Sequence, residues 1–193
     1  MEISFLNELK RKAIHLLALV IPVSYFFLPQ TTALLLYTPL ALGSIILDLI
    51  RIKKYHLGRV LTWVLRPILR RHERRGFTGS SYILSAMVLS IIFFEKRIAV
   101  AGISFIIVGD VAAALIGRIF GKIKVIEKKS MEGSSAFIFS CVLIAWVIPG
   151  LPFWIGLVGA CVATIIEALP LPIDDNFIVP LFSGLVMEIL YLI

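Results

Sequence analysis

Apolar residues fill most of the chain in long runs, which short polar or proline-containing connections separate. A helix needs about 20 apolar residues to cross the hydrocarbon core of a bilayer, and several of these runs approach that length. Pro29, Pro149 and Pro152 lie in tight connections, as expected for turns between antiparallel neighbours. The pattern predicts an all-α, polytopic transmembrane bundle of about seven spans, at residues 13–29, 31–50, 79–95, 98–118, 135–149, 152–169 and 177–193.

The composition agrees with a membrane protein. Of the 193 residues, 60% are hydrophobic and only 16% are charged, and the mean hydropathy is +1.01. A soluble domain carries about 25% charged residues. Cys141 and Cys161 lie in apolar runs without metal-binding spacing, which indicates packing rather than zinc binding. We expect residues 1–193 to form a single integral-membrane domain.

The basic residues predict the orientation of the bundle. The chain has 19 Lys and Arg against 12 Asp and Glu, a net charge of +7, and the basic residues gather between hydrophobic runs. The positive-inside rule explains this distribution better than nucleic-acid binding does. A seven-span arrangement with the N-terminus inside places 17 of the 19 basic residues on the cytoplasmic side and the C-terminus outside.

The loop over residues 51–78 is a different kind of segment. Apolar residues recur in it at helical spacing, and arginines fill the intervening positions. This pattern predicts an amphipathic helix on the cytoplasmic face of the membrane. Two roles suit it: anchoring to anionic headgroups, or lining an entrance for a nucleotide or lipid headgroup.

Charged residues at the ends of three apolar runs should share the cytoplasmic face. They are Asp110, the loop 117–134 and the segment 167–176. Charge kept at membrane depth is costly, so its presence indicates a functional site. We therefore expect the active-site loops in these two segments, with Asp110 beside them.

The loop 117–134 has the composition of a phosphate site. Cationic side chains suit phosphate oxygens, and the start of a helix presents backbone N–H groups to an anion. An ordinary positively charged inside loop with a serine cap is the alternative. The pattern is neither the GxxxxGK[ST] loop nor the kinase glycine loop. The expected phosphate-binding residues are Arg118, Lys122, Lys124, Lys129, Ser130, Gly133 and Ser134.

Acidic residues in the same regions suit a divalent cation. Mg²⁺ prefers one or two carboxylates together with phosphates and water, and the expected ligands are Asp110, Glu132, Asp174 and Asp175. Helix capping by the residues 174–176 and a buried ion pair of Asp110 with Arg118 or a lysine are the alternatives. Further contacts to the same site are expected from Arg11, Lys12, His15, Glu167 and Asn176.

Taken together, these motifs resemble those of the polyprenol kinase family, which includes dolichol kinase, phytol kinase and the CTP-dependent diacylglycerol kinase. The resemblance spans nearly the whole chain, and its second half is the more specific. The matching residues are Glu8, Arg11, Lys12, His15, Gly109, Asp110, Ala113, Gly117, Arg118, Gly121, Lys122, Lys129, Ser130, Glu132, Gly133, Ser134, Glu167, Asp174, Asp175, Asn176 and Pro180.

The resemblance implies a membrane kinase that transfers the γ-phosphate of CTP, with Mg²⁺, to the hydroxyl of a lipid alcohol such as phytol, geranylgeraniol or a dolichol-type polyprenol. It implies catalytic roles for Asp110, Lys129 and Glu132, and the short chain suits a prokaryotic cell membrane. The implied partners are a nucleoside triphosphate, the lipid alcohol and the bilayer, without nucleic acid; the oligomeric state stays open. A CTP:lipid-phosphate cytidylyltransferase and a cation transporter are the alternative functions.

Overall fold

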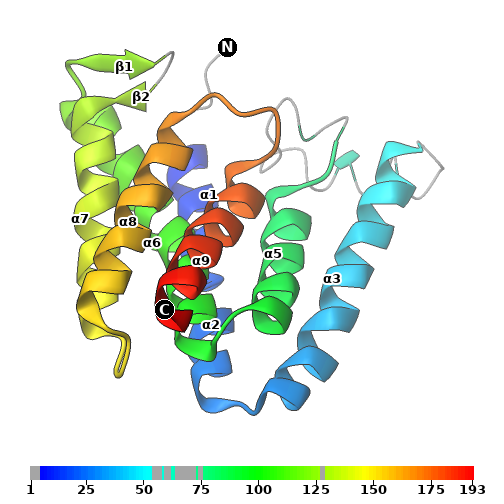
Figure 1. Cartoon of the computed structure of the whole chain (residues 1–193). Helices are drawn as coiled ribbons and strands as arrows, with labels where there is room; N and C mark the ends of the chain where they lie inside the picture. The colour runs from blue at the N-terminus through cyan, green and yellow to red at the C-terminus, as the bar shows by residue number, and fades with distance from the viewer. Residues whose placement is uncertain (1–4, 54–57, 59–61, 64–72, 74–75, 127–128) are drawn as a thin grey trace.

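The computed structural model describes residues 5–53, 58, 62–63, 73, 76–126 and 129–193, and these form a helical bundle (Figure 1). A two-stranded hairpin, β1 (Lys124–Ile126) and β2 (Lys129–Ser130), is added at one end. The helices are α1 (Phe5–Leu17), α2 (Val20–Phe27), α3 (Gln30–Ile52), α5 (Gly79–Phe93), α6 (Lys96–Phe120), α7 (Met131–Val147), α8 (Phe153–Ala168) and α9 (Asp175–Leu192).

Each of the predicted spans contains a helix, but the first is divided in two. The chain tightens between α1 and α2, where the N–H groups of Ala18, Leu19 and Ile21 each donate to the carbonyl three residues back. Pro22 has no N–H, and its ring would clash with the carbonyl of Ala18 in a continuous helix. The division at residues 18–19 therefore follows from Pro22.

The fold is all-α and membrane-like, as expected. Within the described residues, α3, α6 and α9 are long and apolar enough to cross a membrane, whereas α5, α7 and α8 are shorter apolar helices. Large apolar side chains such as Phe27 (78% exposed) and Leu35 (73% exposed) cover the outside. Exposed apolar surface of this extent requires a nonaqueous surrounding. The number of seven spans stays a prediction, and most of the predicted 51–78 amphipathic helix lies outside the described residues.

Helix α6 is the centre of the bundle. Helices α1, α2, α5, α7, α8 and α9 all pack against it, and its residues 98–107 are buried on every side. A helix that is apolar all round belongs in an interior. Its contact with α7 is close because Gly109 has no side chain: a Cβ atom there would lie 2.6 Å from the Phe137 ring.

The β1–β2 hairpin was not expected from the sequence. Lys124 pairs with Ser130 and Ile126 with Lys129 in an antiparallel register that contains an irregularity. The hairpin, the α8–α9 connection and the beginning of α1 lie at the same end of the bundle (Figure 1). Segments far apart in the sequence are thus brought to one end.

A buried ion pair holds the end of α3 against the beginning of α5. Arg51 Nη2 donates to Asp48 Oδ1 (2.8 Å), and Arg51 also donates to the carbonyls of Glu73 and Gly76. Asp48 Oδ2 accepts from the backbone N–H of Thr78 (2.7 Å) and from the Ser81 hydroxyl (2.6 Å). Both charges have their hydrogen-bonding capacity largely filled, which a buried ion pair requires.

Substitution of Asp48 should destabilise the protein strongly. Asp48→Ala leaves the buried Arg51 charge uncompensated, and the expected loss is about 3 kcal/mol of unfolding free energy. Thr164→Ala is the control, because the Thr164 hydroxyl donates only within its own helix, to Ala160 (2.8 Å), and should cost about 0.5 kcal/mol. Denaturant unfolding in mixed detergent micelles measures both. Equal losses for the two variants would contradict the role given to Asp48.

Candidate functional site

Asp110 is held by α1. Lys12 Nζ lies 2.5 Å from Asp110 Oδ2 and donates to the Asp110 carbonyl oxygen (2.9 Å). His15 Nε2 lies 3.7 Å from the same carboxylate oxygen. Lys12 is buried, so its ammonium group depends on this partner for compensation. A lysine does pair with Asp110, and it comes from another helix rather than from the two turns that follow Asp110.

Lys129 joins the hairpin to the ends of α8 and α9. Its Nζ lies 3.0 Å from Glu167 Oε1 and 3.3 Å from Asp175 Oδ2, and it also donates to the Glu167 carbonyl oxygen. Glu167 is buried at 7% exposure. Two carboxylates therefore share one ammonium group at the end of the bundle where the hairpin lies.

These two charge clusters are neighbours. The carboxylate of Asp110 lies within electrostatic range of Glu167 and of Asp175, and Asp174 lies within range of His15. The structure thus brings together Asp110, the hairpin lysine and the 167–176 segment, together with Lys12 and His15 of α1. Arg11 lies half-buried on the same helix.

The beginning of α7 packs closely against the end of α6. Ser130 is the N-cap of α7, and its hydroxyl accepts from the Gly133 N–H (3.1 Å). A Cβ atom on Gly133 would lie 3.0 Å from the Ala113 carbonyl oxygen and 3.4 Å from Gly117 Cα. The serine cap foreseen as an alternative is therefore present, and Ser134 is half-buried one residue beyond Gly133. Arg118, Lys122 and Lys124 are exposed around this helix start.

Glu132 closes the loop before the hairpin. Its Oε1 accepts from the backbone N–H groups of Lys122 (3.0 Å) and Ile123 (3.4 Å). The Lys122 N–H bond is the main reason why the pKa of Glu132 lies below its usual value. Oε2 of the same carboxylate is buried and has no hydrogen-bond partner.

The beginning of α9 is capped by Asp174. Asp174 Oδ1 accepts from the Asn176 N–H (3.0 Å) and from Asn176 Nδ2 (2.7 Å). One acid of the 174–175 pair thus serves as the helix cap and the other contacts Lys129. Asn176 also lies against Gly79 of α5, a contact for which the polar run 78–81 gave the only signal in the sequence.

The carboxylates suit a divalent ion only if a bound phosphate compound supplies further oxygen atoms. Among the described residues, no group of three or more His, Cys, Asp or Glu side chains is placed to hold a metal ion. Mg²⁺ needs only one or two carboxylates when phosphate oxygens and water complete its shell. Asp110 and Asp175 fit that requirement, because both are oxygen donors at one end of the bundle and each lies beside an ammonium group that phosphates could take over.

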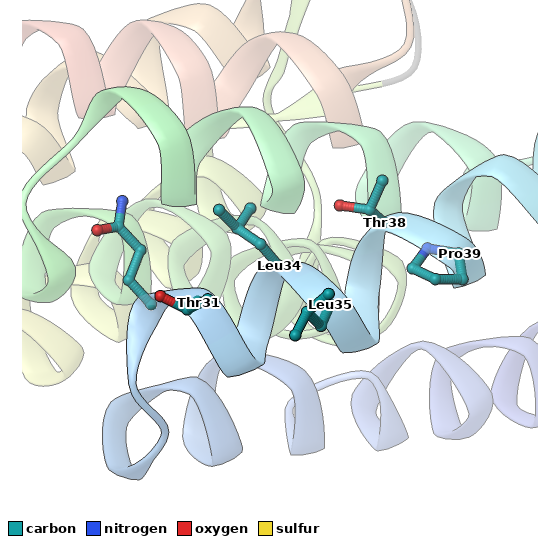
Figure 2. Close-up of a pocket in the computed structure, with 6 residues that line it drawn as sticks. Thr31, Leu34, Leu35, Thr38 and Pro39 are labelled. Atoms are coloured by element: carbon teal, nitrogen blue, oxygen red, sulfur yellow. The ribbon is translucent and has the colours of Figure 1, made fainter.

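A separate groove of about 560 Å³ runs along α3. Figure 2 shows Thr31, Leu34, Leu35, Thr38 and Pro39 along it, and Gln30 completes the lining. It lies near the end of α3 away from the charge clusters (Figure 1). Its lining contains no ionisable side chain, so it lacks the groups that bind phosphates.

Comparison with known proteins identifies lipid kinases among the relatives. The chain is 28% identical over 170 residues to CTP-dependent diacylglycerol kinase 1 of Saccharomyces cerevisiae, covering 74% of this chain and 59% of that protein. It is 27% identical over 166 residues to a probable chloroplastic phytol kinase of Triticum aestivum, covering 75% and 55%. An uncharacterized protein of Rickettsia prowazekii is 28% identical over 187 residues, 90% of each chain.

These relatives confirm the resemblance to the polyprenol kinase family. The match spans little more than half the length of the yeast and wheat proteins. No family model and no solved structure matches the chain. The chain is thus similar to phosphotransferases, and these relatives do not determine its own substrates.

The backbone bonds of Glu132 should depend on pH. Because the folded pKa is lowered, the ionised carboxylate holds the loop above the usual pKa of about 4.3, and this stabilisation is lost as the pH falls through the lowered value. In Glu132→Gln the weaker neutral acceptor should speed amide exchange at Lys122 and Ile123 at neutral pH and remove the pH step. Hydrogen exchange with mass spectrometry measures the protection, and the inner turns of α7 serve as the internal control. Wild-type protection in Glu132→Gln would contradict this role.

Proposed function

We propose that this protein is a membrane-embedded kinase that transfers the γ-phosphate of CTP to the hydroxyl of a lipid alcohol. The observation that supports it most is the pairing of Asp110 with Lys12 and of Asp175 with Lys129 beside the start of α7. Phosphoryl transfer needs positioning and charge neutralisation more than covalent chemistry. The names of the yeast and wheat relatives support CTP as donor and a lipid alcohol as acceptor.

The triphosphate would be bound between the hairpin and the end of α6. The exposed side chains of Arg118, Lys122 and Lys124 surround the start of α7, whose positive dipole end favours an anion. Lys129 would leave its carboxylate partners for phosphate oxygens. Ser130, Gly133 and Ser134 would lie beside the phosphate at the start of α7, which Gly117 and Gly133 allow to pack closely against the end of α6.

Asp110, Asp174 and Asp175 would hold the divalent cation. Asp174 and Glu132 are the weaker candidates, because one oxygen of each already accepts two hydrogen bonds. When bound, Mg²⁺ neutralises charge on the phosphate oxygens. The carboxylates that would hold it come from α6 and α9, so the reacting phosphate would be bound near these two helices.

Asp110 would also orient the acceptor hydroxyl. It is one-quarter exposed, and it lies on the central helix within range of both clusters. His15 Nε2 is buried 3.7 Å from its carboxylate and could share the proton. A lipid hydroxyl at headgroup level would reach this point while its tail stays among the helices.

The proposal includes an orientation. The N-terminus and the end of the bundle that carries the hairpin would face the cytoplasm of a prokaryotic cell, where CTP is available, and seven spans would leave the C-terminus outside. The basic 51–78 segment would lie on the cytoplasmic membrane surface and attract anionic headgroups.

Incubation with labelled CTP tests the reaction. Detergent-purified protein with Mg²⁺ and γ-labelled CTP should label geranylgeraniol, phytol or a diacylglycerol and release CDP. ATP in place of CTP identifies the donor. Release of pyrophosphate with a lipid phosphate as acceptor, and no labelled lipid, would instead establish cytidylyl transfer and refute the kinase.

Asp110→Asn should reduce turnover by more than any loss of folded protein explains, since the variant also leaves the buried Lys12 charge without its carboxylate. Loss of a group that orients the acceptor proton is expected to lower kcat about 100-fold or more. Glu188→Gln is the matched control, because Glu188 accepts from the Glu95 N–H (2.7 Å) far from the charge clusters and should keep wild-type turnover. Wild-type kcat in Asp110→Asn would refute its role as the group that orients the hydroxyl.

Asp175→Asn should weaken the response to Mg²⁺. Removal of one carboxylate ligand is expected to raise the Mg²⁺ concentration for half-maximal activity about tenfold or more. The measurement is initial rate against Mg²⁺ at saturating CTP, with Glu188→Gln again as the control. An unchanged Mg²⁺ requirement would assign Asp175 only to its ion pair with Lys129.

A further inference from the structure

Successive residues at the beginning of α9 face different neighbours. Asp175 contacts Lys129 of the hairpin (3.3 Å). Asn176 lies against α5, where a Cβ atom on Gly79 would be 3.1 Å from Asn176 Nδ2. The Phe177 ring packs edge-on against Tyr82 of α5, with centroids 6.3 Å apart. Asn176 is therefore on the side of α9 that faces α5, whereas the phosphate-binding lysines are on the other.

The carboxamide of Asn176 is half satisfied. The side chain is only 8% exposed, and its Nδ2 donates to Asp174 Oδ1 (2.7 Å). Its Oδ1 is buried and has no hydrogen-bond partner. The opposite orientation of the amide would place two oxygens against each other, so the donor to Asp174 fixes Oδ1 as the unpaired atom. An unpaired buried acceptor is destabilising, because it has lost its hydrogen bonds to water and gained none in the protein.

The polar groups nearest to Asn176 on α5 are already engaged. The N–H of Gly79 donates to Glu73 Oε1 (3.1 Å), and the hydroxyls of Thr78 and Ser81 donate to Asp48 (2.9 and 2.6 Å). These three groups are thus engaged elsewhere, and Asn176 Oδ1 is left able to accept from a bound molecule. The rings of Phe77, Tyr82 and Phe177 pack edge-on in series beside it, which gives the position an apolar wall.

We propose that Asn176 Oδ1 accepts a hydrogen bond from the hydroxyl of the lipid alcohol when the alcohol binds without nucleotide, in a site between the beginnings of α5 and α9. Asp110 would take over this single proton only in the transfer step. This inference rests on the proposed function and names the group that recognises its acceptor. In-line phosphoryl transfer requires acceptor and leaving group on opposite sides of the phosphate. The phosphate-binding groups lie on the hairpin side of Asp175, and Asn176 lies on the α5 side. The aromatic wall would contact the first carbons of the tail.

A binding comparison without nucleotide tests this assignment. The probes are geranylgeraniol and the hydrocarbon in which hydrogen replaces its hydroxyl, titrated as mole fractions in detergent and followed by intrinsic tryptophan fluorescence. Wild-type protein should prefer the alcohol about tenfold, because the hydroxyl satisfies a buried acceptor. Asn176→Leu, similar in size but without the acceptor, should lose this preference. Ser183→Ala is the matched control: Ser183 is buried on the same helix, and its hydroxyl already donates to Val179 (2.7 Å).

Equal binding of the two probes by wild-type protein, or an unchanged preference in Asn176→Leu, would overturn the proposal. The wild-type comparison needs no variant and holds even if Asn176→Leu folds poorly. In the transfer assay the KM for the lipid alcohol should rise about tenfold in Asn176→Leu while the KM for CTP stays the same. A raised KM for CTP alone would mean that Asn176 binds the amino group of the base, and would overturn it too. Failure of the proposed kinase function would be distinguished by a separate result, the absence of labelled lipid with the wild-type protein.

Discussion

The contact between Lys12 and Asp110 is the interaction on which the arrangement of this site depends. Helix α6 is apolar along most of its length and is surrounded by other helices, yet it carries a carboxylate in its second half. An unpaired carboxylate there would be expensive to remove from water. The 2.5 Å contact with a lysine that is itself buried resolves this cost, and it fixes α1 against α6. The same pairing requirement places Arg51 on Asp48 and Lys129 on Glu167.

Paired charges of this kind are also suited to a change of partner. Without nucleotide, the ammonium groups of Lys12 and Lys129 neutralise carboxylates that the proposed reaction assigns to a metal ion. A metal–nucleotide complex brings two positive charges for the acids and several negative charges for the lysines. The exchange keeps the site close to neutral in both states, so little net charge has to be buried when substrate binds. Metal binding and phosphate binding are therefore expected to depend on each other.

The sequence was sufficient for the helices and insufficient for their contacts. The apolar runs predicted a helix in each range, because residues that span a bilayer must satisfy their backbone groups within the segment. The sequence pattern did not predict the division at Pro22, because it depends on a single proline. It also missed the hairpin at 124–130, because its short strands have no strong periodicity. The sequence placed Lys12 among the further contacts to the site but did not show that it pairs with Asp110, because the two are 98 residues apart and only packing decides which helix faces α6. Asn176 gave a capping signal, whereas its contact with Gly79 depends on the α5–α9 interface.

The depth of Asp110 connects the bundle to its proposed substrates. Ten residues of helix separate Asp110 from Phe120 at the end of α6, a rise of about 15 Å. A carboxylate at that depth lies below the hairpin, and the proposed reaction would bring the lipid hydroxyl to this level. In the proposed reaction a nucleotide would have to extend its phosphates down toward it, and the hairpin carries Lys124 and Lys129 at the top of that path. The lipid would then meet the phosphate without leaving the bilayer. In that case the membrane itself would position one of the two reactants.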